Sequence, residues 1–203
     1  MDVRPLGKTG LRVSELGVCL PPDREAARGV ARRAAEAGVT LFVASDVLAL
    51  DTAREAAPEA ALVLSRGDDH FLRMGARDAA SGDDFVVGPF NLIDQTPFGP
   101  ACRAGKGVIA VHVLKGGALA GRVGHTPRGA LVTRYASLVK PRRTLAQLAI
   151  QFALANEYVS CAVVRVSTPT HLAEALGALE AEPLTTGELE QIFETYANRH
   201  DPT

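Results

Sequence analysis

His112 and Lys115 are the residues of this chain whose types and spacing best suit acid–base chemistry. They follow the apolar run at residues 108–111, which predicts a short buried strand. Imidazole gives and accepts protons near neutral pH, and a lysine amine binds anions or forms a Schiff base with a carbonyl compound. We therefore predict that both residues are catalytic. The alternative is a packed histidine with one hydrogen bond and a surface lysine.

Other polar side chains follow further predicted strands. Asp46 and Arg66 come directly after, or close after, the apolar runs at residues 39–44 and 61–65, so we expect them to face one another. They would form a substrate-binding pair or a structural salt bridge, and Asp46 is our third predicted catalytic residue. The predicted substrate-binding residues, which share a place at a strand end, are Arg66, Cys19, Arg165 and Asn91. Buried, unreactive cysteine is the alternative for Cys19.

Alternating strands and helices must position these side chains. The apolar runs predict strands at residues 15–20, 39–44, 61–65, 85–87, 107–113 and 160–164. Between and after them, capping residues and helical spacing predict helices at residues 23–37, 51–57, 100–104 and 144–156, and helices that begin near residues 167 and 185. Strands that alternate with helices are parallel and are joined by right-handed crossovers. We expect about six parallel strands.

Three segments fall outside this alternation. Residues 2–14 alternate polar and apolar side chains around a Gly-Lys-Thr-Gly turn, which predicts an N-terminal β-hairpin. Residues 66–84 and the glycine-rich residues 116–129 predict loops, the first of them an insertion.

Composition limits the classes of function. The 203 residues predict a single domain over 1–203, and the formal net charge of −1 gives no reason to expect a nucleic-acid partner. No apolar run reaches the roughly 20 residues of a membrane helix. The 3 cysteines lie far apart without metal-ligand spacing, and no secretory signal is seen at the N-terminus. We predict a soluble, cytoplasmic protein without a metal.

Three blocks of sequence resemble the aldo-keto reductase family, in the family's order. The first is residues 4–17, with the sequence RPLGKTGLRVSELG. The second joins NLID at residues 91–94 to GVIAVHVLKGGALAGR at residues 107–122. The third begins with TLAQLA at residue 144 and ends with TPTHL at residue 172. The resemblance implies a TIM-type (β/α) barrel, a nicotinamide cofactor and carbonyl reduction.

The same resemblance implies that the family's catalytic tetrad is missing. The family's Asp and Tyr belong to a segment that here reads FVASDVL, which leaves Val43 and Leu48 in their places. Arg66 stands where the family has its Lys, and arginine does not exchange protons near neutral pH. The His belongs to a stretch that the chain lacks, together with the fourth and fifth β/α units. The truncated barrel must then close with six strands, or a second copy or a partner enzyme must cover its open edges.

The cofactor site implied by the resemblance is also altered. Arg165 replaces a glycine that admits the cofactor backbone, and Ser167 and Ala175 replace residues that contact the adenosine end. A helix that begins at Thr168 offers only a weak anion site. We therefore expect no cofactor.

Three functions follow from these observations. The first is an enzyme that keeps the barrel fold of the family and performs cofactor-independent acid–base catalysis on a small organic metabolite, as an isomerase, cyclase or lyase. The second is a non-catalytic binding or scaffold protein that acts through a partner or a homodimer. The third is a residual NADP-dependent oxidoreductase.

Overall fold

A computed structural model gives the architecture of the chain and describes residues 1–65, 71–73, 84–95, 98–121, 127–141 and 143–199. The strands are β1 (Val3–Pro5), β2 (Arg12–Ser14), β3 (Leu16–Cys19), β4 (Leu41–Ala44), β5 (Ala61–Ser65), β6 (Phe71–Arg73), β7 (Phe85–Asn91), β8 (Asp94–Gln95), β9 (Gly107–Val111) and β10 (Cys161–Arg165). The α-helices are α1 (Arg24–Glu36), α2 (Val47–Ala56), α3 (Gly99–Arg103), α4 (Pro127–Tyr135), α5 (Leu145–Ala155), α6 (Pro169–Glu180) and α7 (Thr186–Ala197). Two 3₁₀ helices, η1 (Lys115–Ala120) and η2 (Ala136–Leu138), complete the described elements.

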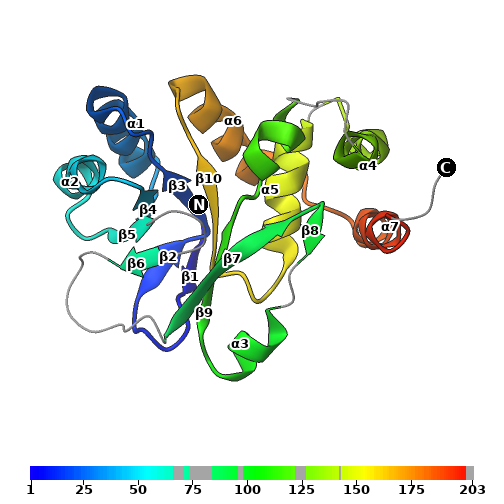
Figure 1. Cartoon of the computed structure of the whole chain (residues 1–203), viewed down its shortest axis with the longest axis horizontal. Helices are drawn as coiled ribbons and strands as arrows, with labels where there is room; N and C mark the ends of the chain where they lie inside the picture. The colour runs from blue at the N-terminus through cyan, green and yellow to red at the C-terminus, as the bar shows by residue number, and fades with distance from the viewer. Residues whose placement is uncertain (66–70, 74–83, 96–97, 122–126, 142, 200–203) are drawn as a thin grey trace.

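Six parallel strands form the centre of the molecule, as the sequence predicts (Figure 1). Their order is β5-β4-β3-β10-β9-β7, so the first predicted strand lies beside the last. The antiparallel hairpin of β1 and β2 is also confirmed. These elements define a truncated TIM-type barrel with an N-terminal hairpin.

Of the two alternatives for the shortened barrel, closure by pairing of β5 with β7 is not found in the described residues. Each of these terminal strands instead takes an antiparallel neighbour. β6 pairs with β5 through Phe71 and Ser65, and β8 pairs with β7 through Asp94 and Asn91. The backbone groups at these two strands are therefore satisfied in part by local hairpin-like pairing, and the sheet stays open.

The helix boundaries follow from capping side chains. Asp23 accepts a hydrogen bond from the Ala26 amide at the start of α1, and α5 begins with a capping box of Thr144 and Gln147. Thr185 and Glu188 form a second capping box at α7. Each cap satisfies backbone amides that a helix leaves free at its first turn.

Five elements differ from the sequence-based expectations in ways that affect the site or the sheet. Helix α2 begins at Val47, four residues before the expected start, because Asp46 caps it. Within residues 116–129, which were expected to form a loop, η1 continues to Ala120 and α4 begins at Pro127. The short strands β6 and β8 were not predicted. Most of the expected insertion at residues 66–84 lies outside the described residues.

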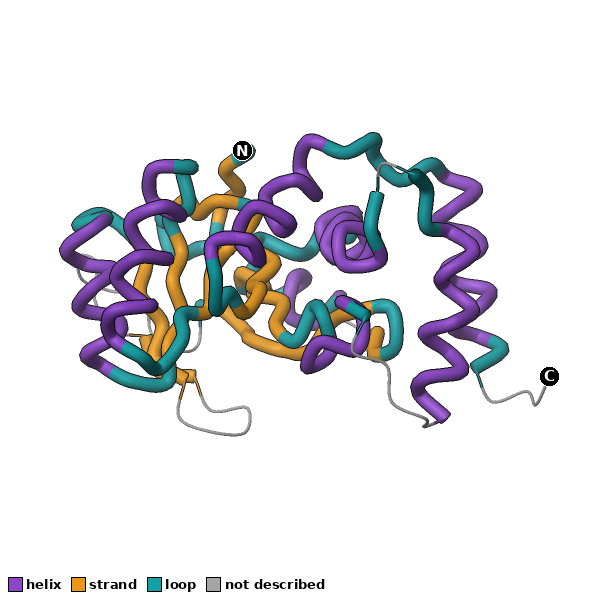
Figure 2. Tube along the Cα trace, turned by 90° about the horizontal axis from the view of Figure 1, so that it is seen from above, coloured by secondary structure: helices purple, strands orange, loops and turns teal. Residues whose placement is uncertain are grey.

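Two apolar clusters pack against the two faces of the sheet. The larger lies between the outer face of the sheet and the helices, whose arrangement around the strands is seen in Figure 2. The smaller lies on the inner face and joins Leu6 and Val13 of the hairpin region to Val63 of β5, Phe85 of β7 and Ile109 of β9. Because this inner cluster includes both terminal parallel strands, it holds the open sheet in a curved form.

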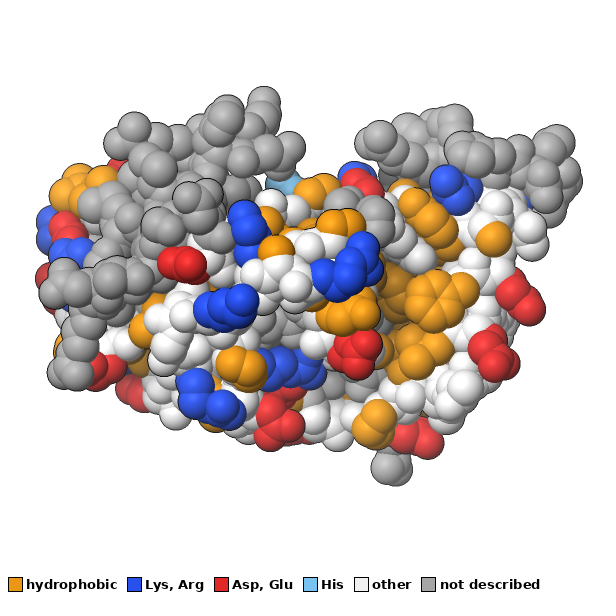
Figure 3. Space-filling model, turned by 90° about the horizontal axis from the view of Figure 1, so that it is seen from below, with side chains coloured by type: hydrophobic (Ala, Val, Ile, Leu, Met, Phe, Trp, Pro, Cys, Tyr) orange, Lys and Arg blue, Asp and Glu red, His pale blue; other side chains and the backbone are white. Residues whose placement is uncertain are grey.

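The outer cluster reaches the surface at α7. Phe98, Phe90, Phe152 and Phe193 form a row of ring contacts with centroid separations of 5.2 to 6.0 Å. Phe193 is 52% exposed. Figure 3 shows that apolar side chains gather on this side of the lower face, while charged side chains are scattered over the rest. No helix in the described part of the chain is both long and apolar enough to cross a membrane.

Candidate functional site

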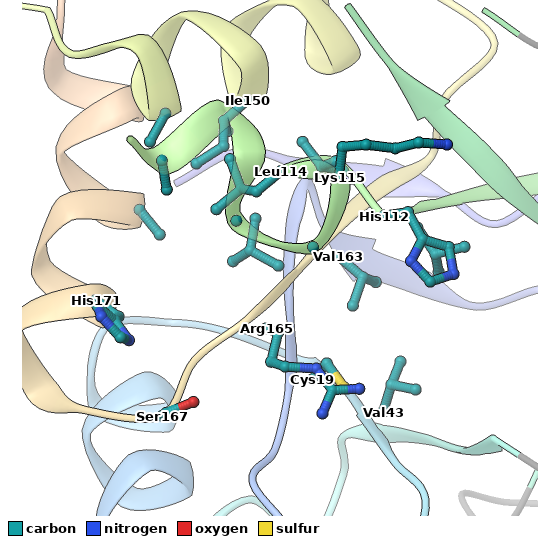
Figure 4. Close-up of a pocket in the computed structure, with 18 of the residues that line it drawn as sticks. Cys19, Val43, His112, Leu114, Lys115, Ile150, Val163, Arg165, Ser167 and His171 are labelled. Carbon is teal, nitrogen blue, oxygen red and sulfur yellow. The ribbon is translucent and has the colours of Figure 1, made fainter. Parts of the chain in front are cut away.

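A cleft of about 1070 Å³ lies at the carboxyl ends of the parallel strands. This is the end at which parallel α/β sheets and barrels carry their ligands, since the loops that follow the strands meet there. Its polar lining residues are Cys19, Ser45, Asp94, His112, Lys115, Arg165, Ser167, His171 and Glu174. Figure 4 shows Arg165, Cys19, Val43 and His112 around one part of the cleft, and Ser167 and His171 toward helix α6.

His112 and Lys115 line the cleft together, as the strand-end interpretation predicts. Both adopt left-handed backbone conformations, with φ of 54° and 45°, which cost free energy for residues other than glycine. The Lys115 amide donates to the His112 carbonyl at 2.7 Å and forms a tight turn after β9. This turn leaves the His112 side chain exposed, and Lys115 Nζ forms an ion pair with Asp94 Oδ2 at 3.3 Å.

Arg165 and Cys19 occupy opposite positions on neighbouring strands. The register of β10 and β3 pairs them directly, and both line the cleft. Arg165 is exposed, and no carboxylate in the described part of the chain forms an ion pair with it. Burial raises the pKa of the Cys19 thiol, and the Arg165 guanidinium opposes that rise in part. The thiol is therefore mostly protonated at neutral pH.

Asn91 lies under the cleft and is not among its lining residues. Its side chain is fully buried and donates from Nδ2 to the His112 carbonyl at 3.1 Å. Its Oδ1 accepts from the Ile93 and Asp94 amides at 2.9 and 3.0 Å. The predicted substrate-binding residue thus uses its amide to hold two loops.

Asp46 also has a local partner. Its Oδ1 accepts from the Leu48 amide at 2.8 Å as the N-cap of α2, and the residue is not part of the cleft lining. The next candidate, Arg66, lies outside the described residues, so its expected pairing with Asp46 stays a prediction. Val43, in the position implied for the family's Asp, is buried and lines the cleft. Leu48, in the position implied for the Tyr, is 54% exposed on α2.

Three polar lining residues were not predicted from the sequence. Ser45 follows β4 directly, whereas His171 and Glu174 lie in the first two turns of α6. A search of strand ends misses a helix residue, although the spacing of three residues places both on one face. Thr144 Oγ1 donates to Glu174 Oε1 at 3.0 Å and joins α5 to this side of the cleft.

The 3 tyrosines of the sequence all lie elsewhere in the described structure. The Tyr135 hydroxyl donates to the Leu92 carbonyl at 2.7 Å, and burial raises the pKa of this phenol further above its usual value. Tyr196 accepts from the Gln95 amide at 3.4 Å, and Tyr158 is 43% exposed near α3. No phenol therefore lines the cleft in the part of the chain that the structure describes.

Comparison with known proteins agrees with this architecture. The model of the aldo/keto reductase family matches residues 84–197, which is more than half of the chain. The chain therefore belongs to the aldo-keto reductase family. The match contains the second and third blocks that resemble the family, and the first block lies before it.

Solved structures show the same fold over nearly the whole chain. The holo form of aldo-keto reductase AKR11C1 from Bacillus halodurans has a TM-score of 0.73 and 17% sequence identity, and the match covers 96% of each chain. The apo form of the same protein has a TM-score of 0.65 and 16% identity, again over 96% of each chain. No curated protein matches the sequence.

Proposed function

We propose that this aldo-keto reductase family member binds a small anionic organic molecule in its cleft and transforms it by proton transfer, without a nicotinamide cofactor. The observation that carries the proposal is that an exposed histidine and an arginine without a described ion-pair partner, His112 and Arg165, face the same cleft. Many isomerase, cyclase and lyase reactions begin with such a proton transfer.

Each polar residue of the cleft has a role in the proposed reaction that follows from its chemistry. Arg165 binds the carboxylate or carbonyl oxygen of the substrate, because a guanidinium stays charged and donates several hydrogen bonds. His112 removes a proton from the adjacent carbon, and the electron pair moves toward the oxygen that Arg165 holds. Return of the proton at another carbon gives an isomer, and expulsion of a leaving group gives an alkene. Lys115, in its ion pair with Asp94, lines the cleft on the same side as His112 and can donate a hydrogen bond to the substrate.

Two features of the site support chemistry other than hydride transfer. No described tyrosine lines the cleft, and Val43 places a methyl group where the family has a carboxylate. A third feature argues against a good fit for nicotinamide. In Figure 4 the Arg165 side chain lies next to Cys19, with Val43 to one side, so a charged group occupies the cleft at the ends of β10 and β3. Asp46 takes no part in the proposal, because its carboxylate caps α2.

Hydrogen exchange tests the proton transfer without knowledge of the natural substrate. Small 2-oxo acids are incubated with the protein in D₂O, and loss of the signal from the protons next to the carbonyl is followed by NMR. We expect His112→Gln to slow this exchange by at least about 100-fold. His171→Gln, which changes the other described histidine of the cleft, should keep most of it. Exchange by His112→Gln at the wild-type rate contradicts the proposal.

NADPH binding tests the cofactor part of the proposal separately. A ligand that binds only the folded state stabilises it by about 2.7 kcal/mol at 100 times its dissociation constant, which raises the melting temperature measurably. We expect no shift with NADPH at millimolar concentration. A shift of several degrees would restore the residual NADP-dependent reductase as the function.

A protein that works through assembly is the second candidate. It is favoured by the exposed Phe193 beside other apolar side chains and by a sheet that ends in two short strands. This candidate predicts a homodimer whose dissociation constant rises in Phe193→Ser. Sedimentation over a concentration series measures it, and a monomer at all concentrations removes the candidate.

A further inference from the structure

A closed ring of hydrogen bonds joins the loop after β7 to the loop after β9. Asn91 Nδ2 donates to the His112 carbonyl, and the Lys115 amide donates to the same oxygen. Lys115 Nζ then reaches Asp94 Oδ2, and the Asp94 amide returns to Asn91 Oδ1. Asn91 takes part in this ring twice, as donor and as acceptor.

The burial of Asn91 makes these bonds stronger constraints than surface contacts. The residue has no exposed area, so a broken bond would leave a polar atom without water as a substitute. Five earlier residues of β7, Phe85 to Pro89, lie in parallel register with β9, so a paired strand fixes the position of the amide. The side-chain amide of Asn91 therefore fixes the positions of the two loops relative to the sheet.

The left-handed conformation of His112 explains why such a constraint is needed. A non-glycine residue with φ of 54° relaxes to ordinary backbone angles unless its surroundings hold it. The His112 carbonyl is held by two donors, one from the Asn91 side chain and one from Lys115, which is itself left-handed. Relaxation at His112 would turn its imidazole relative to the cleft and to Arg165.

We propose that Asn91 is a positioning residue, which holds His112 and the Lys115–Asp94 pair in the arrangement needed for proton transfer in the cleft. The role in turnover rests on the proposed function, whereas the geometric role does not. Asn91 itself does not touch the substrate, because it lies beneath the cleft lining.

Asn91→Asp distinguishes the hydrogen bonds that Asn91 accepts from the one that it donates to His112. The aspartate keeps an oxygen that accepts from the Ile93 and Asp94 amides, and it replaces the donor to His112 by a second oxygen that repels the carbonyl. Gln151→Glu is the matched control. Gln151 is also buried, and its Nε2 donates to the carbonyls of Ala178, Ala181 and Glu182, away from the loops after β7 and β9.

The experiment has one readout on the free protein and one on turnover. By NMR, we expect Asn91→Asp to move the ring signals of His112, assigned by comparison with His112→Gln, and to speed exchange of the Lys115 amide about fivefold. In the D₂O assay, kcat should fall about 10- to 100-fold while KM stays within about twofold. Gln151→Glu should lower the melting temperature and change none of these quantities.

The two proposals fail in different ways. If Asn91→Asp leaves the His112 ring signals and the Lys115 amide exchange at wild-type values, the positioning role of Asn91 is overturned. If the wild-type protein exchanges no substrate protons, the proposed function fails, and the NMR readout still decides the geometric role. Should Asn91→Asp not fold, Asn91→Ala is measured in the same way and judged by the same two NMR quantities.

Discussion

At the scale of single residues, the Cys19–Arg165 pair offers a direct test of the cleft geometry. Burial raises the pKa of Cys19, and Arg165 lowers it in part, so removal of the guanidinium should raise it further. We expect Arg165→Gln to slow alkylation of Cys19 by iodoacetamide at pH 7.5, because only the thiolate reacts. Peptide mass spectrometry measures the rate at each cysteine.

Cys102 is the internal control for that measurement. Burial and then Glu157 raise its pKa, and Arg165 is not among the causes, so its rate should not change in Arg165→Gln. Fully buried Cys161 should not react in the folded protein. Equal slowing at Cys19 and Cys102 would mean that the effect of Arg165→Gln does not depend on proximity to Cys19.

Residue types at strand ends predicted part of the site. His112, Lys115, Cys19 and Arg165 line the cleft because parallel strands end at one edge, whatever the details of packing. The position at a strand end did not distinguish residues that line the cleft from residues that bind nearby backbone amides. The side-chain oxygens of Asp46 and Asn91 accept hydrogen bonds from backbone amides two or three residues later in the chain. Short polar side chains often do so, and the sequence alone indicates it only weakly.

At the scale of elements, helix α7 depends on one buried carboxylate. Burial alone raises the pKa of Glu188, yet hydrogen bonds from Arg143, Thr185 and Lys140 outweigh burial and bring it to about 2 from an ordinary value of 4.5. A depressed carboxylate pKa stabilises the fold above about pH 4.5, and the stabilisation is lost as pH falls toward 2. Glu188→Gln should therefore lower the free energy of unfolding at pH 7 by about 3 kcal/mol.

Measurements at several pH values show whether the loss of stability in Glu188→Gln comes from the charge of the carboxylate. The difference between wild type and Glu188→Gln, measured by urea unfolding, should shrink as pH falls from 5 to 3. Glu190→Gln, an exposed change on the same helix, should stay within about 0.5 kcal/mol of wild type at every pH. A difference that is the same at pH 7 and pH 3 would assign the loss to packing.

Caps and periodicity predicted elements well where the pattern was local. The capping boxes at Thr144 and Thr185 and the N-cap at Asp23 place three helices within about one residue. Strands β6 and β8 have only 3 and 2 residues, too few for an alternating pattern to be recognised. They exist because a neighbouring strand offers free backbone groups, which is tertiary information.

At the scale of the whole molecule, the number and direction of the central strands followed from the sequence, but closure did not. Whether β5 and β7 meet depends on the curvature that the whole inner cluster imposes, not on the residues of either strand alone. The open order of the described sheet and the covering of both its ends by antiparallel strands could not be derived from the alternation of strands and helices.

The inner cluster should also decide how the molecule unfolds. Leu6 is 3% exposed and joins the hairpin to the strands of both halves, and a Cβ on Gly107 of β9 would lie 2.6 Å from its Cδ1. We expect Leu6→Ala to lower the free energy of unfolding by about 2–5 kcal/mol through lost burial and the cavity left behind. Val3→Ala, an exposed change on the same hairpin, should cost less than about 0.5 kcal/mol. Calorimetry of Leu6→Ala should show a single unfolding peak at a lower temperature, because the cluster couples the two ends of the sheet. A peak that splits in two would mean that the strands β3 to β5 and the strands β7 to β10 unfold independently.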